Sequence, residues 1–281
     1  MNYQLNIAWF YPDLMSTYGD RGNIIVMQKR CEWRRIKVNI DKINLDSPDN
    51  LLNRSDLLFM GGAQDRQQKL VGQDFLSFKA PKVKAMIENN IPALFVCAAY
   101  QFAGHYYKPY QGEKIPGAGI FDLYTEHLGD QSKRLIGNVV AKLFLGHSLE
   151  NLPAQAGGNL KDPRVKPACA GKPEDDNLFL NKTIVGFENH GGRTYLGKNI
   201  LPLAKIIKGF GNNGEDGFEG AIYKNALGSY FHGPLLPKNP QLADWLIKKA
   251  LEVKYGNQIK LERLNDDLEW QAHDFAKKLK D

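Results

Sequence analysis

The sequence predicts an α/β protein with a mainly parallel β-sheet and helices on both of its faces. Short apolar runs, typical of buried strands, alternate in the N-terminal third with segments whose apolar residues have helical spacing. Short loops join these segments, which is the connection pattern of a parallel sheet. Two of the apolar runs stop at the pair Gly61–Gly62 and at Cys97. Ligands of parallel sheets bind beyond such carboxyl ends.

The elements of the N-terminal third follow from these patterns. LNIAWFY is continuously apolar, as in a strand buried on both faces, whereas GNIIVMQKRCEWRRI repeats its apolar residues at helical intervals. SDLLFMGG and PALFV are again strand-like and end at the glycine pair and the cysteine. In order, we expect strands at 5–11, 37–45, 55–62 and 92–96 and helices at 22–36 and 81–90.

The remaining chain is richer in strands. We expect strand-rich segments at 134–144, 183–189 and 219–231, followed by a helix at 239–256. Residues 147–180 are rich in Pro, Gly, Asn and Asp and are predicted to form a long surface excursion. No linker separates two hydrophobic cores, so residues 1–257 are predicted to form one domain.

Residues 258–281 are predicted to form a C-terminal helical tail. Their helical spacing produces one apolar stripe, made of Leu261, Leu264, Leu268, Ala272, Phe275 and Leu279. Two fates of this stripe remain open. It packs against the core of the same chain, or it docks in a groove of a partner protein.

Composition excludes several classes of protein. Of the 281 residues 43% are hydrophobic, and no apolar run approaches the ~20 residues that span a bilayer. The N-terminus lacks the features of a signal peptide, and three scattered cysteines fit neither a disulfide framework nor a metal site, so a reduced, cytoplasmic location is expected. The net charge of +6 comes mostly from clusters on helix faces without a nucleic-acid-binding motif, so we expect no nucleic-acid partner.

Cys97 is the candidate nucleophile. A sharp turn between a strand and a helix presents a thiol at the helix N-terminus, where the partial positive charge favours the thiolate. The backbone N–H of Ala98, with a second donor from Gly62, would then face the oxyanion formed by attack on a carbonyl. The alternative is one more buried thiol, the commoner state of a free cysteine. Cys31, in a charged helix, and Cys169, in the excursion, lack this strand–turn–helix setting.

A cysteine nucleophile also needs a base that takes the thiol proton and returns it to the leaving group. Two of the six histidines lie at a strand end and precede a glycine: His190 in ENHGGRT and His232 in YFHGPLL. The other four lie close to the cysteine in sequence, in the excursion or in the tail: His105, His127, His147 and His273.

Six motifs, in order, carry a family resemblance. They are FMGGAQDRQQ (59–68), PALFVCAAYQFAG (92–104), RLIGN (134–138), GFENHGGRTYLG (186–197), GFGNN (209–213) and SYFHGPLLPKNP (229–240). Together they resemble the GatD family, the glutaminase subunits of the lipid II isoglutaminyl synthase MurT–GatD. That family belongs to the cobyric-acid-synthase type of class I glutamine amidotransferases.

The resemblance implies a flavodoxin-like class I glutamine amidotransferase fold and a glutaminase that works in a heterodimer with a MurT-like Mur ligase. This chain would hydrolyse L-glutamine, and the ligase would use the ammonia to amidate D-glutamate to D-isoglutamine in lipid II during peptidoglycan synthesis. ATP and metal are expected on the ligase, with no cofactor in this chain. Two alternatives stay open: an amidotransferase serving another acceptor, such as a corrin precursor, and a non-catalytic regulatory subunit.

The resemblance also implies residue roles. In the wider class the base lies on the last strand before a C-terminal helix, which favours His232 over His190. The acid usually found two positions after that histidine is replaced by Pro234. We therefore expect a Cys97–His232 dyad and leave open an orienting acid from the partner. Arg134, a plain surface arginine without the resemblance, is expected to bind the α-carboxylate of glutamine.

Two motifs need a separate interpretation. The family commonly has two glycines after the nucleophile, where this chain has Ala98 and Ala99, so the turn must accept a Cβ. The motif YGDRGN (18–23) lacks the GK[ST] of a phosphate-binding loop. It is predicted to be structural, with Asp20 capping the first helix.

Overall fold

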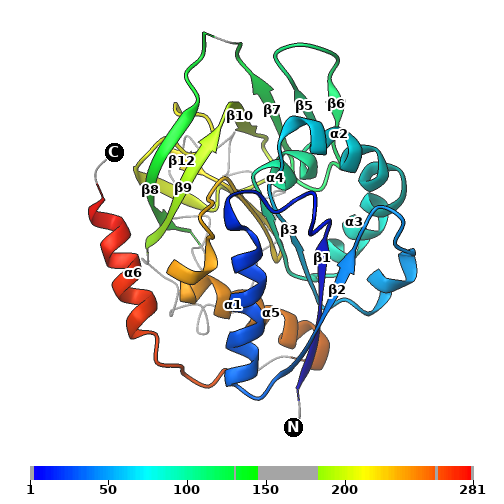
Figure 1. The fold of residues 1–281 in the computed structure, drawn as a ribbon, viewed down its shortest axis with the longest axis vertical. Helices are drawn as coiled ribbons and strands as arrows, with labels where there is room; N and C mark the ends of the chain where they lie inside the picture. The colour runs from blue at the N-terminus through cyan, green and yellow to red at the C-terminus, as the bar shows by residue number, and fades with distance from the viewer. Residues whose placement is uncertain (1–2, 130, 145–182, 257–258, 280–281) are drawn as a thin grey trace.

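A six-stranded sheet forms the centre of the protein in a computed structural model that describes residues 3–129, 131–144, 183–256 and 259–279 (Figure 1). The strand order is β13-β14-β4-β3-β1-β2. Every neighbouring pair is parallel except β13 and β14. The bounds are Gln4–Phe10 (β1), Lys37–Ile43 (β2), Leu57–Met60 (β3), Ala93–Val96 (β4), Ala221–Tyr223 (β13) and Ala226–Ser229 (β14). The predicted fold class is confirmed.

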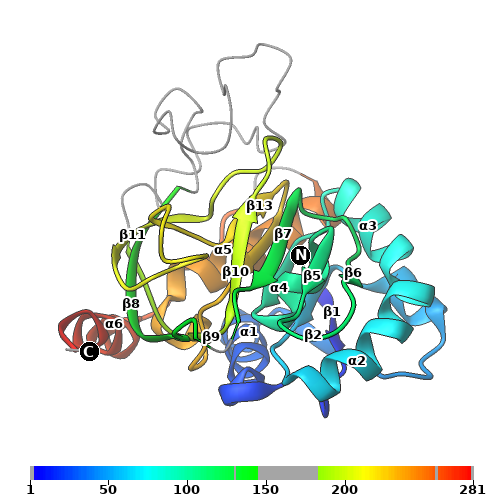
Figure 2. The ribbon, with the colours of Figure 1, turned by 90° about the horizontal axis from the view of Figure 1, so that it is seen from above.

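Helices cover both faces of this sheet (Figure 2). α1 (Arg21–Trp33) and α5 (Pro240–Tyr255) pack on one face, and α2 (Asp65–Asp74), α3 (Ala80–Glu88) and α4 (Ala98–Ala103) pack on the other. A π-helical turn, η3 (Phe75–Lys79), joins α2 to α3. The strands face both layers because successive side chains alternate: in β1, Leu5 and Ile7 belong to the first core, whereas Ala8 and Phe10 belong to the second.

Two four-stranded sheets extend the central one. One has the order β10-β7-β5-β6 and the other the order β12-β11-β8-β9. Their strands are Tyr106–Lys108 (β5), Ile115–Pro116 (β6), Leu123–His127 (β7), Leu135–Leu143 (β8), Thr183–His190 (β9), Gly192–Leu196 (β10), Ala204–Lys208 (β11) and Phe218–Glu219 (β12). The antiparallel β8–β9 ladder runs from the pair Leu135–His190 to the pair Lys142–Thr183.

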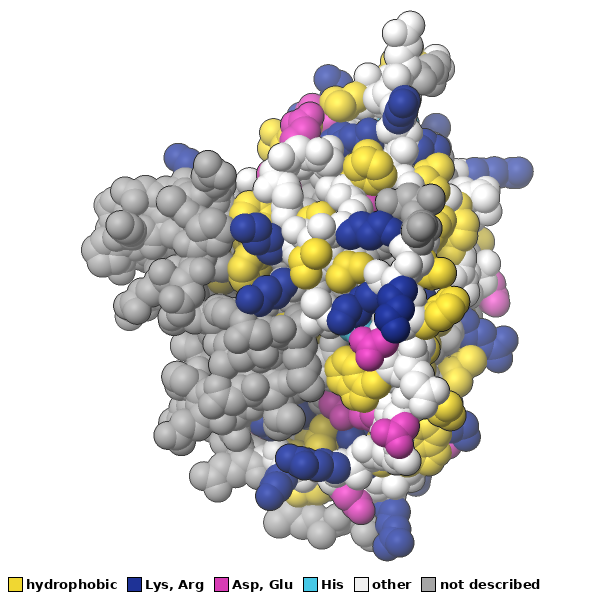
Figure 3. Space-filling model, turned by 90° about the vertical axis from the view of Figure 1, so that its left-hand side faces the viewer, with side chains coloured by type: hydrophobic (Ala, Val, Ile, Leu, Met, Phe, Trp, Pro, Cys, Tyr) yellow, Lys and Arg dark blue, Asp and Glu magenta, His cyan; other side chains and the backbone are white. Residues whose placement is uncertain are grey.

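The C-terminal segment differs from its prediction. Among the described residues of this segment only α6 (Asp267–Lys278) is helical, and it packs against β8, β9 and the 3-10 turn Leu236–Lys238. The expected stripe does not face inward, because Leu268 and Phe275 are 76% and 66% exposed while His273 is buried. Helical periodicity identified an apolar face, but it does not show whether that face lies against the core or in solvent. Figure 3 shows this side of the molecule, where Lys and Arg side chains alternate with apolar ones.

The segment before α6 is held by contacts that a continuous helix would lose. Ile259 and Leu261 pack against the core, and Asp266 accepts hydrogen bonds from the buried Arg30 guanidinium (2.6 and 3.0 Å). The domain boundary at residue 257 stays a prediction, and the excursion 147–180 lies outside the described residues. In the part of the chain that the structure describes, no helix is long and apolar enough to cross a membrane.

Candidate active site

Four adjacent strands bring the predicted residues to one edge of the central sheet. Because β14, β4, β3 and β1 run parallel, their carboxyl ends lie side by side. His232 follows β14, Cys97 follows β4 and Gly62 follows β3. The loop after β1 reaches the same edge through Asp20, whose carboxylate contacts His232. The edge is the place where ligands of parallel sheets bind.

Cys97 lies at a strained turn between β4 and α4. Its φ and ψ are 54° and −105°, a conformation that L residues rarely adopt. The turn is held on both sides, because the Cys97 N–H donates to the Ser229 carbonyl (2.8 Å) and its carbonyl accepts from the Gln101 N–H (3.0 Å). Strain of this kind persists only where the surroundings hold it and is common at active sites.

The same turn explains why alanines are accepted after the cysteine. The positive φ belongs to Cys97 itself, and Ala98 and Ala99 already lie in α4, where a Cβ causes no strain. The Ala98 N–H is in the first turn of that helix, whose N–H groups lack intrahelical acceptors. It therefore keeps the donor that an oxyanion needs. That role of Ala98 stays a prediction.

His232 is fixed beside the cysteine by backbone and side-chain contacts. Its N–H donates to the Phe187 carbonyl (2.8 Å) and its carbonyl accepts from the Phe187 N–H (3.2 Å). Its Nδ1 is 3.2 Å from Asp20 Oδ1, and both side chains are fully buried. A Cβ at Gly62 would lie 2.7 Å from His232 Cε1 and 3.2 Å from Cys97 Cβ, so a glycine is needed where these residues converge.

The charges around His232 favour its protonated form. Burial by itself lowers the pKa of the ring, but the Cys97 thiolate and the Asp20 carboxylate outweigh burial and raise the pKa to about 10. The Nε2 atom is buried without a hydrogen-bond partner among the described residues. With Nδ1 at Asp20, Nε2 is the ring atom left to exchange a proton.

Comparison with known proteins shows the family of this chain. The family model of the CobB/CobQ-like glutamine amidotransferase domain matches residues 6–240. The chain belongs to this amidotransferase family. It is 36% identical over 270 residues to the lipid II isoglutaminyl synthase (glutamine-hydrolyzing) subunit GatD of Staphylococcus aureus, covering 96% of this chain and 93% of that protein. The GatD of Streptococcus pneumoniae is also 36% identical, with 95% and 88% covered.

A more distant relative shares only this part of a longer protein. Cobyric acid synthase of Pelotomaculum thermopropionicum is 25% identical over 237 residues, which are 82% of this chain and 37% of that protein. The resemblance to GatD that the six motifs indicated is thus confirmed over nearly the whole amidotransferase chain.

One predicted donor of this amidotransferase is already occupied. The Gly62 N–H donates to Asp20 Oδ2 at 2.6 Å, and the Gly62 carbonyl accepts from the Thr17 N–H and hydroxyl at 3.2 and 3.0 Å. The sequence predicted a free N–H here. In the arrangement observed, Gly62 receives an oxyanion only if it exchanges its carboxylate partner.

Arg134 is linked to the dyad through two residues. Its Nε and Nη2 donate to the side-chain and backbone oxygens of Asn189, both at 3.1 Å. The Asn189 amide donates to the Tyr18 hydroxyl (2.8 Å), and the Tyr18 ring lies edge-on to His232 with centroids 5.0 Å apart. Asn189 thus occupies the Nε side of the guanidinium.

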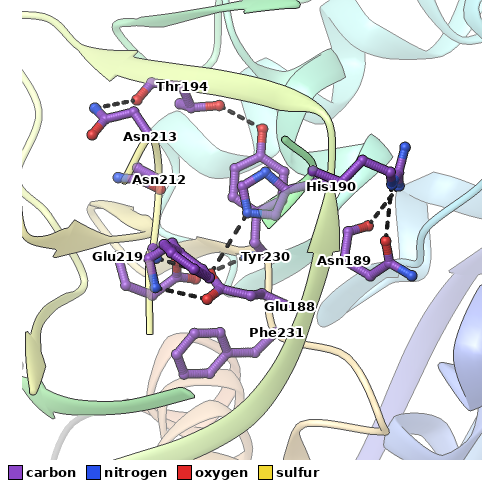
Figure 4. Close-up of polar contacts among 12 residues, drawn as sticks. Glu188, Asn189, His190, Thr194, Asn212, Asn213, Glu219, Tyr230 and Phe231 are labelled. Carbon is purple, nitrogen blue, oxygen red and sulfur yellow. Dashed lines mark hydrogen bonds and ion pairs between the residues drawn. The ribbon is translucent and has the colours of Figure 1, made fainter. Parts of the chain in front are cut away.

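The competing histidine of the amidotransferase has other contacts. His190 is buried, its Nδ1 donates to the Gly192 carbonyl (2.8 Å), and its ring stacks on Tyr230 with centroids 3.6 Å apart (Figure 4). Its Nε2 is 3.8 Å from Glu188 Oε2. Burial lowers the pKa of His190, and the nearby carboxylate only partly offsets it.

Sequence reasoning missed Asp20. It expected a helix cap, but Asp20 makes no capping hydrogen bond to α1 within the described chain. The edge argument that selected Cys97 and Gly62 would also have selected this acid, because Asp20 ends the loop after β1. Tyr18 and Asn189 were missed too, since their contacts depend on the fold. Among the described residues, no group of His, Cys, Asp and Glu is arranged to hold a metal ion.

Proposed function

We propose that this chain is the glutaminase subunit of a lipid II isoglutaminyl synthase. It hydrolyses L-glutamine and passes ammonia to a cytoplasmic, MurT-like ligase that amidates D-glutamate in lipid II and binds the ATP and metal. The observation that carries the proposal is Cys97 at a strained strand–helix turn with His232 beside it. The likeness to two GatD subunits over most of each chain supports the acceptor.

The geometry supports a two-step hydrolysis. The Cys97 thiolate attacks the side-chain amide carbon of glutamine, and the oxyanion forms near the Ala98 N–H. His232 then donates its Nε2 proton to the nitrogen, ammonia leaves, and a glutamyl thioester remains. In the second step His232 takes a proton from water, hydroxide attacks the thioester, and glutamate leaves as the thiolate is restored. The raised pKa of His232 keeps a proton available for ammonia at neutral pH.

Arg134 is proposed to bind the α-carboxylate of glutamine. A guanidinium presents paired N–H groups that match a carboxylate, and Asn189 holds this one in place. Arg134→Lys should raise KM for glutamine more than it lowers kcat, because a lysine keeps the charge but loses the paired geometry.

The decisive experiment replaces the nucleophile. Cys97→Ala and Cys97→Ser should abolish ammonia release from glutamine by the chain in complex with its ligase, while Cys31→Ser and Cys169→Ser retain it. Cys31 is the matched control because it is a fully buried thiol in α1. Ammonia release by both Cys97 variants at the wild-type rate would refute the chemistry and favour a regulatory subunit.

A second measurement tests the acceptor. With glutamine labelled with ¹⁵N in its side-chain amide, the complex should place the label in lipid II. Transfer of the label only to a corrin precursor would favour an amidotransferase with that other acceptor. The cobyric acid synthase relative differs from this chain in length, because the match covers only 37% of that protein.

A further inference from the structure

Arg193 is a buried arginine of β10 whose hydrogen bonds go to backbone carbonyls. The residue is 5% exposed, its Nη1 donates to the Gly191 carbonyl (3.0 Å), and its Nη2 donates to the Lys133 carbonyl (2.5 Å). Glu126, its neighbour across the β10–β7 ladder, accepts the Tyr106 hydroxyl (3.3 Å) instead of pairing with this guanidinium. A buried charge is costly unless it is paired, so packing alone does not account for an arginine here.

The two carbonyls lie on either side of the end of the β8–β9 ladder, next to Arg134. Lys133 precedes Arg134 in the chain, and the ladder begins directly after Arg134. Gly191 is the residue between β9 and β10, which belong to different sheets. Arg193 therefore links the chain before β8 to the corner between β9 and β10, just beyond the point where the ladder ends.

The Arg134 side chain lies against the same corner. A Cβ added to Gly191 would lie 3.5 Å from Arg134 Nη1, so the glycine lets this guanidinium approach the backbone there. Nε and Nη2 of Arg134 donate to the two oxygens of Asn189, both at 3.1 Å. Asn189 thus holds the guanidinium of Arg134, while Arg193 holds the backbone from which that side chain extends. The direction in which Arg134 presents its N–H groups depends on both.

Two guanidinium groups meet at this corner without a carboxylate between them. Among the described residues, the hydrogen bonds of Arg134 and Arg193 go to carbonyl and amide oxygens only. Such oxygens satisfy the N–H groups but leave the positive charges without a counter-charge. An anionic group that binds here is attracted by both charges. The α-carboxylate of an amino acid is such a group.

We propose that Arg193 is a positioning residue for substrate binding, which holds Arg134 in the orientation that receives the α-carboxylate of glutamine. The inference rests on the proposed function, in which Arg134 binds that carboxylate. A guanidinium suits the task because its planar fork of N–H groups reaches two carbonyls at a fixed separation. A guanidinium that is already held also loses less conformational freedom when the carboxylate binds.

The test is Arg193→Lys in the full chain with its ligase. A lysine keeps the charge but lacks the planar fork, so the backbone at Arg134 is no longer fixed. We expect KM for glutamine to rise about tenfold, with kcat within about threefold of wild type. The reason is that the α-carboxylate is remote from the reacting amide and is bound alike in the ground state and the transition state. A wild-type KM, or a loss of kcat that exceeds the rise in KM, would overturn the proposal.

Arg193→Gln separates the link between the carbonyls from the charge. A glutamine amide has a single NH₂ group and no charge, so both variants lose the link but only one loses the charge. Their KM values should therefore rise to a similar extent. A raised KM in Arg193→Gln alone would show that the charge acts and not the link. Melting temperatures establish that the variants are folded, and if neither folds, Arg193 supports the fold and the positioning role is overturned.

The matched control is Arg34→Lys. Arg34 is also a buried arginine that donates to two backbone carbonyls, those of Glu262 (2.7 Å) and Arg30 (3.2 Å). It lies at the end of α1 opposite to Asp20, away from the site. This variant should keep the wild-type KM for glutamine. The same rise in KM in both variants would contradict a specific role of Arg193.

A double-mutant cycle with Arg134→Lys tests whether Arg193 acts through Arg134. If it does, Arg193→Lys should raise KM less than about twofold in a chain whose Arg134 is already replaced. Independent effects, in which the two fold-changes multiply, would exclude this route of action.

A measurement without turnover separates this inference from the proposed function. With ¹⁵N-labelled arginine in the isolated chain, the Nε–H signal of Arg134 is assigned by its absence from Arg134→Lys. Its order parameter should fall in Arg193→Lys but not in Arg34→Lys. A wild-type complex that releases no ammonia would contradict the proposed function and leave this result standing. An active complex whose Arg134 stays equally ordered in Arg193→Lys would overturn the inference alone.

Discussion

His232 and His190 have similar sequence contexts and opposite environments. Each ends a strand or its extension, precedes a glycine and is buried. His232 Nδ1 meets the Asp20 carboxylate, and the pKa of the ring is raised to about 10. His190 Nδ1 donates to a carbonyl, and burial lowers its pKa. The charged groups around the ring, the Cys97 thiolate ahead of the Asp20 carboxylate, thus decide whether this buried histidine carries charge, and the local sequence does not.

His190 packs against a network of hydrogen-bonded side chains within the core. The Tyr230 hydroxyl, on the ring that His190 covers, bonds to the Thr194 hydroxyl at 2.6 Å (Figure 4). It also accepts a hydrogen bond from Gln101 Nε2 at 3.1 Å. Gln101 belongs to α4, the helix that begins at Ala98. His190 therefore packs against residues that contact α4, the helix after Cys97, whereas His232 contacts the buried Asp20 carboxylate.

The largest expected effect is the loss of activity when His232 is replaced. His232→Ala should lower kcat for ammonia release at least about 100-fold, because it removes the group that protonates ammonia and activates water. Steady-state ammonia release by the complex is the measurement. If His190→Ala has this effect and His232→Ala does not, the assignment of the two histidines is reversed.

The next prediction concerns the loss of stability when His190 is replaced. His190→Ala should lower the free energy of unfolding by about 2–3 kcal/mol, since it opens a cavity on Tyr230 and leaves the Gly192 carbonyl without its donor. Its kcat should stay within about tenfold of wild type. Denaturant unfolding checks the first value. A normal unfolding curve combined with a hundredfold loss of kcat would contradict the supporting role.

A buried acid beside Tyr230 makes the stability of the His190 region depend on pH. Glu219 accepts from the Ser229 hydroxyl and the Tyr230 N–H, both at 2.8 Å, and burial raises its pKa to about 8. Between its ordinary pKa of 4.5 and 8 the unfolded chain releases this proton and the folded chain keeps it. Stability contributed by this group therefore falls as pH rises through that range and is constant above it.

Glu219→Gln should remove that pH dependence. The gap in unfolding free energy between pH 5 and pH 8 should shrink by about 3–4 kcal/mol, because the amide does not ionise. Denaturant curves at the two pH values measure it. An unchanged gap would mean that Glu219 is ionised in the folded protein.

The smallest effect concerns a third buried histidine. His273 in α6 repeats the His190 pattern, with Nδ1 donating to the Lys238 carbonyl (2.7 Å) and Nε2 near the Thr183 hydroxyl (2.8 Å). His273→Ala should lower the unfolding free energy by about 1 kcal/mol and leave kcat unchanged. Thr183→Val, which removes one of the two contacts, should cost less than His273→Ala. A larger loss in Thr183→Val would show that the ring is held elsewhere.

The sequence predicted what local patterns encode. The strands that end at Gly62 and Cys97 were found because apolar runs and glycine stops are contiguous in the chain. The partnership of Asp20 with His232 was not found, since it joins positions at opposite ends of the sequence. His232 itself was preferred on the family resemblance, because its local context is nearly that of His190.

Two other differences have the same physical origin. The positive φ of Cys97 is held by hydrogen bonds to Ser229 in β14 and Gln101 in α4. The contact with β14 joins distant parts of the chain, so the local sequence does not predict it. The helix at Asp267–Lys278 was expected from its periodicity, but the inward face contains His273 rather than Leu268 and Phe275. Periodicity measures how apolar residues are spaced, while their burial depends on what the helix packs against.

The β8–β9 ladder has a consequence for how this protein tolerates changes in chain length. The connection between the strands leaves at the end marked by Lys142 and Thr183, while Arg134, Asn189 and His190 lie at the other end. Seven steps of extended chain separate the two ends, roughly 24 Å. Because side chains alternate along a strand, inserting one residue within β9 would move Asn189 and His190 to the opposite faces of the ladder.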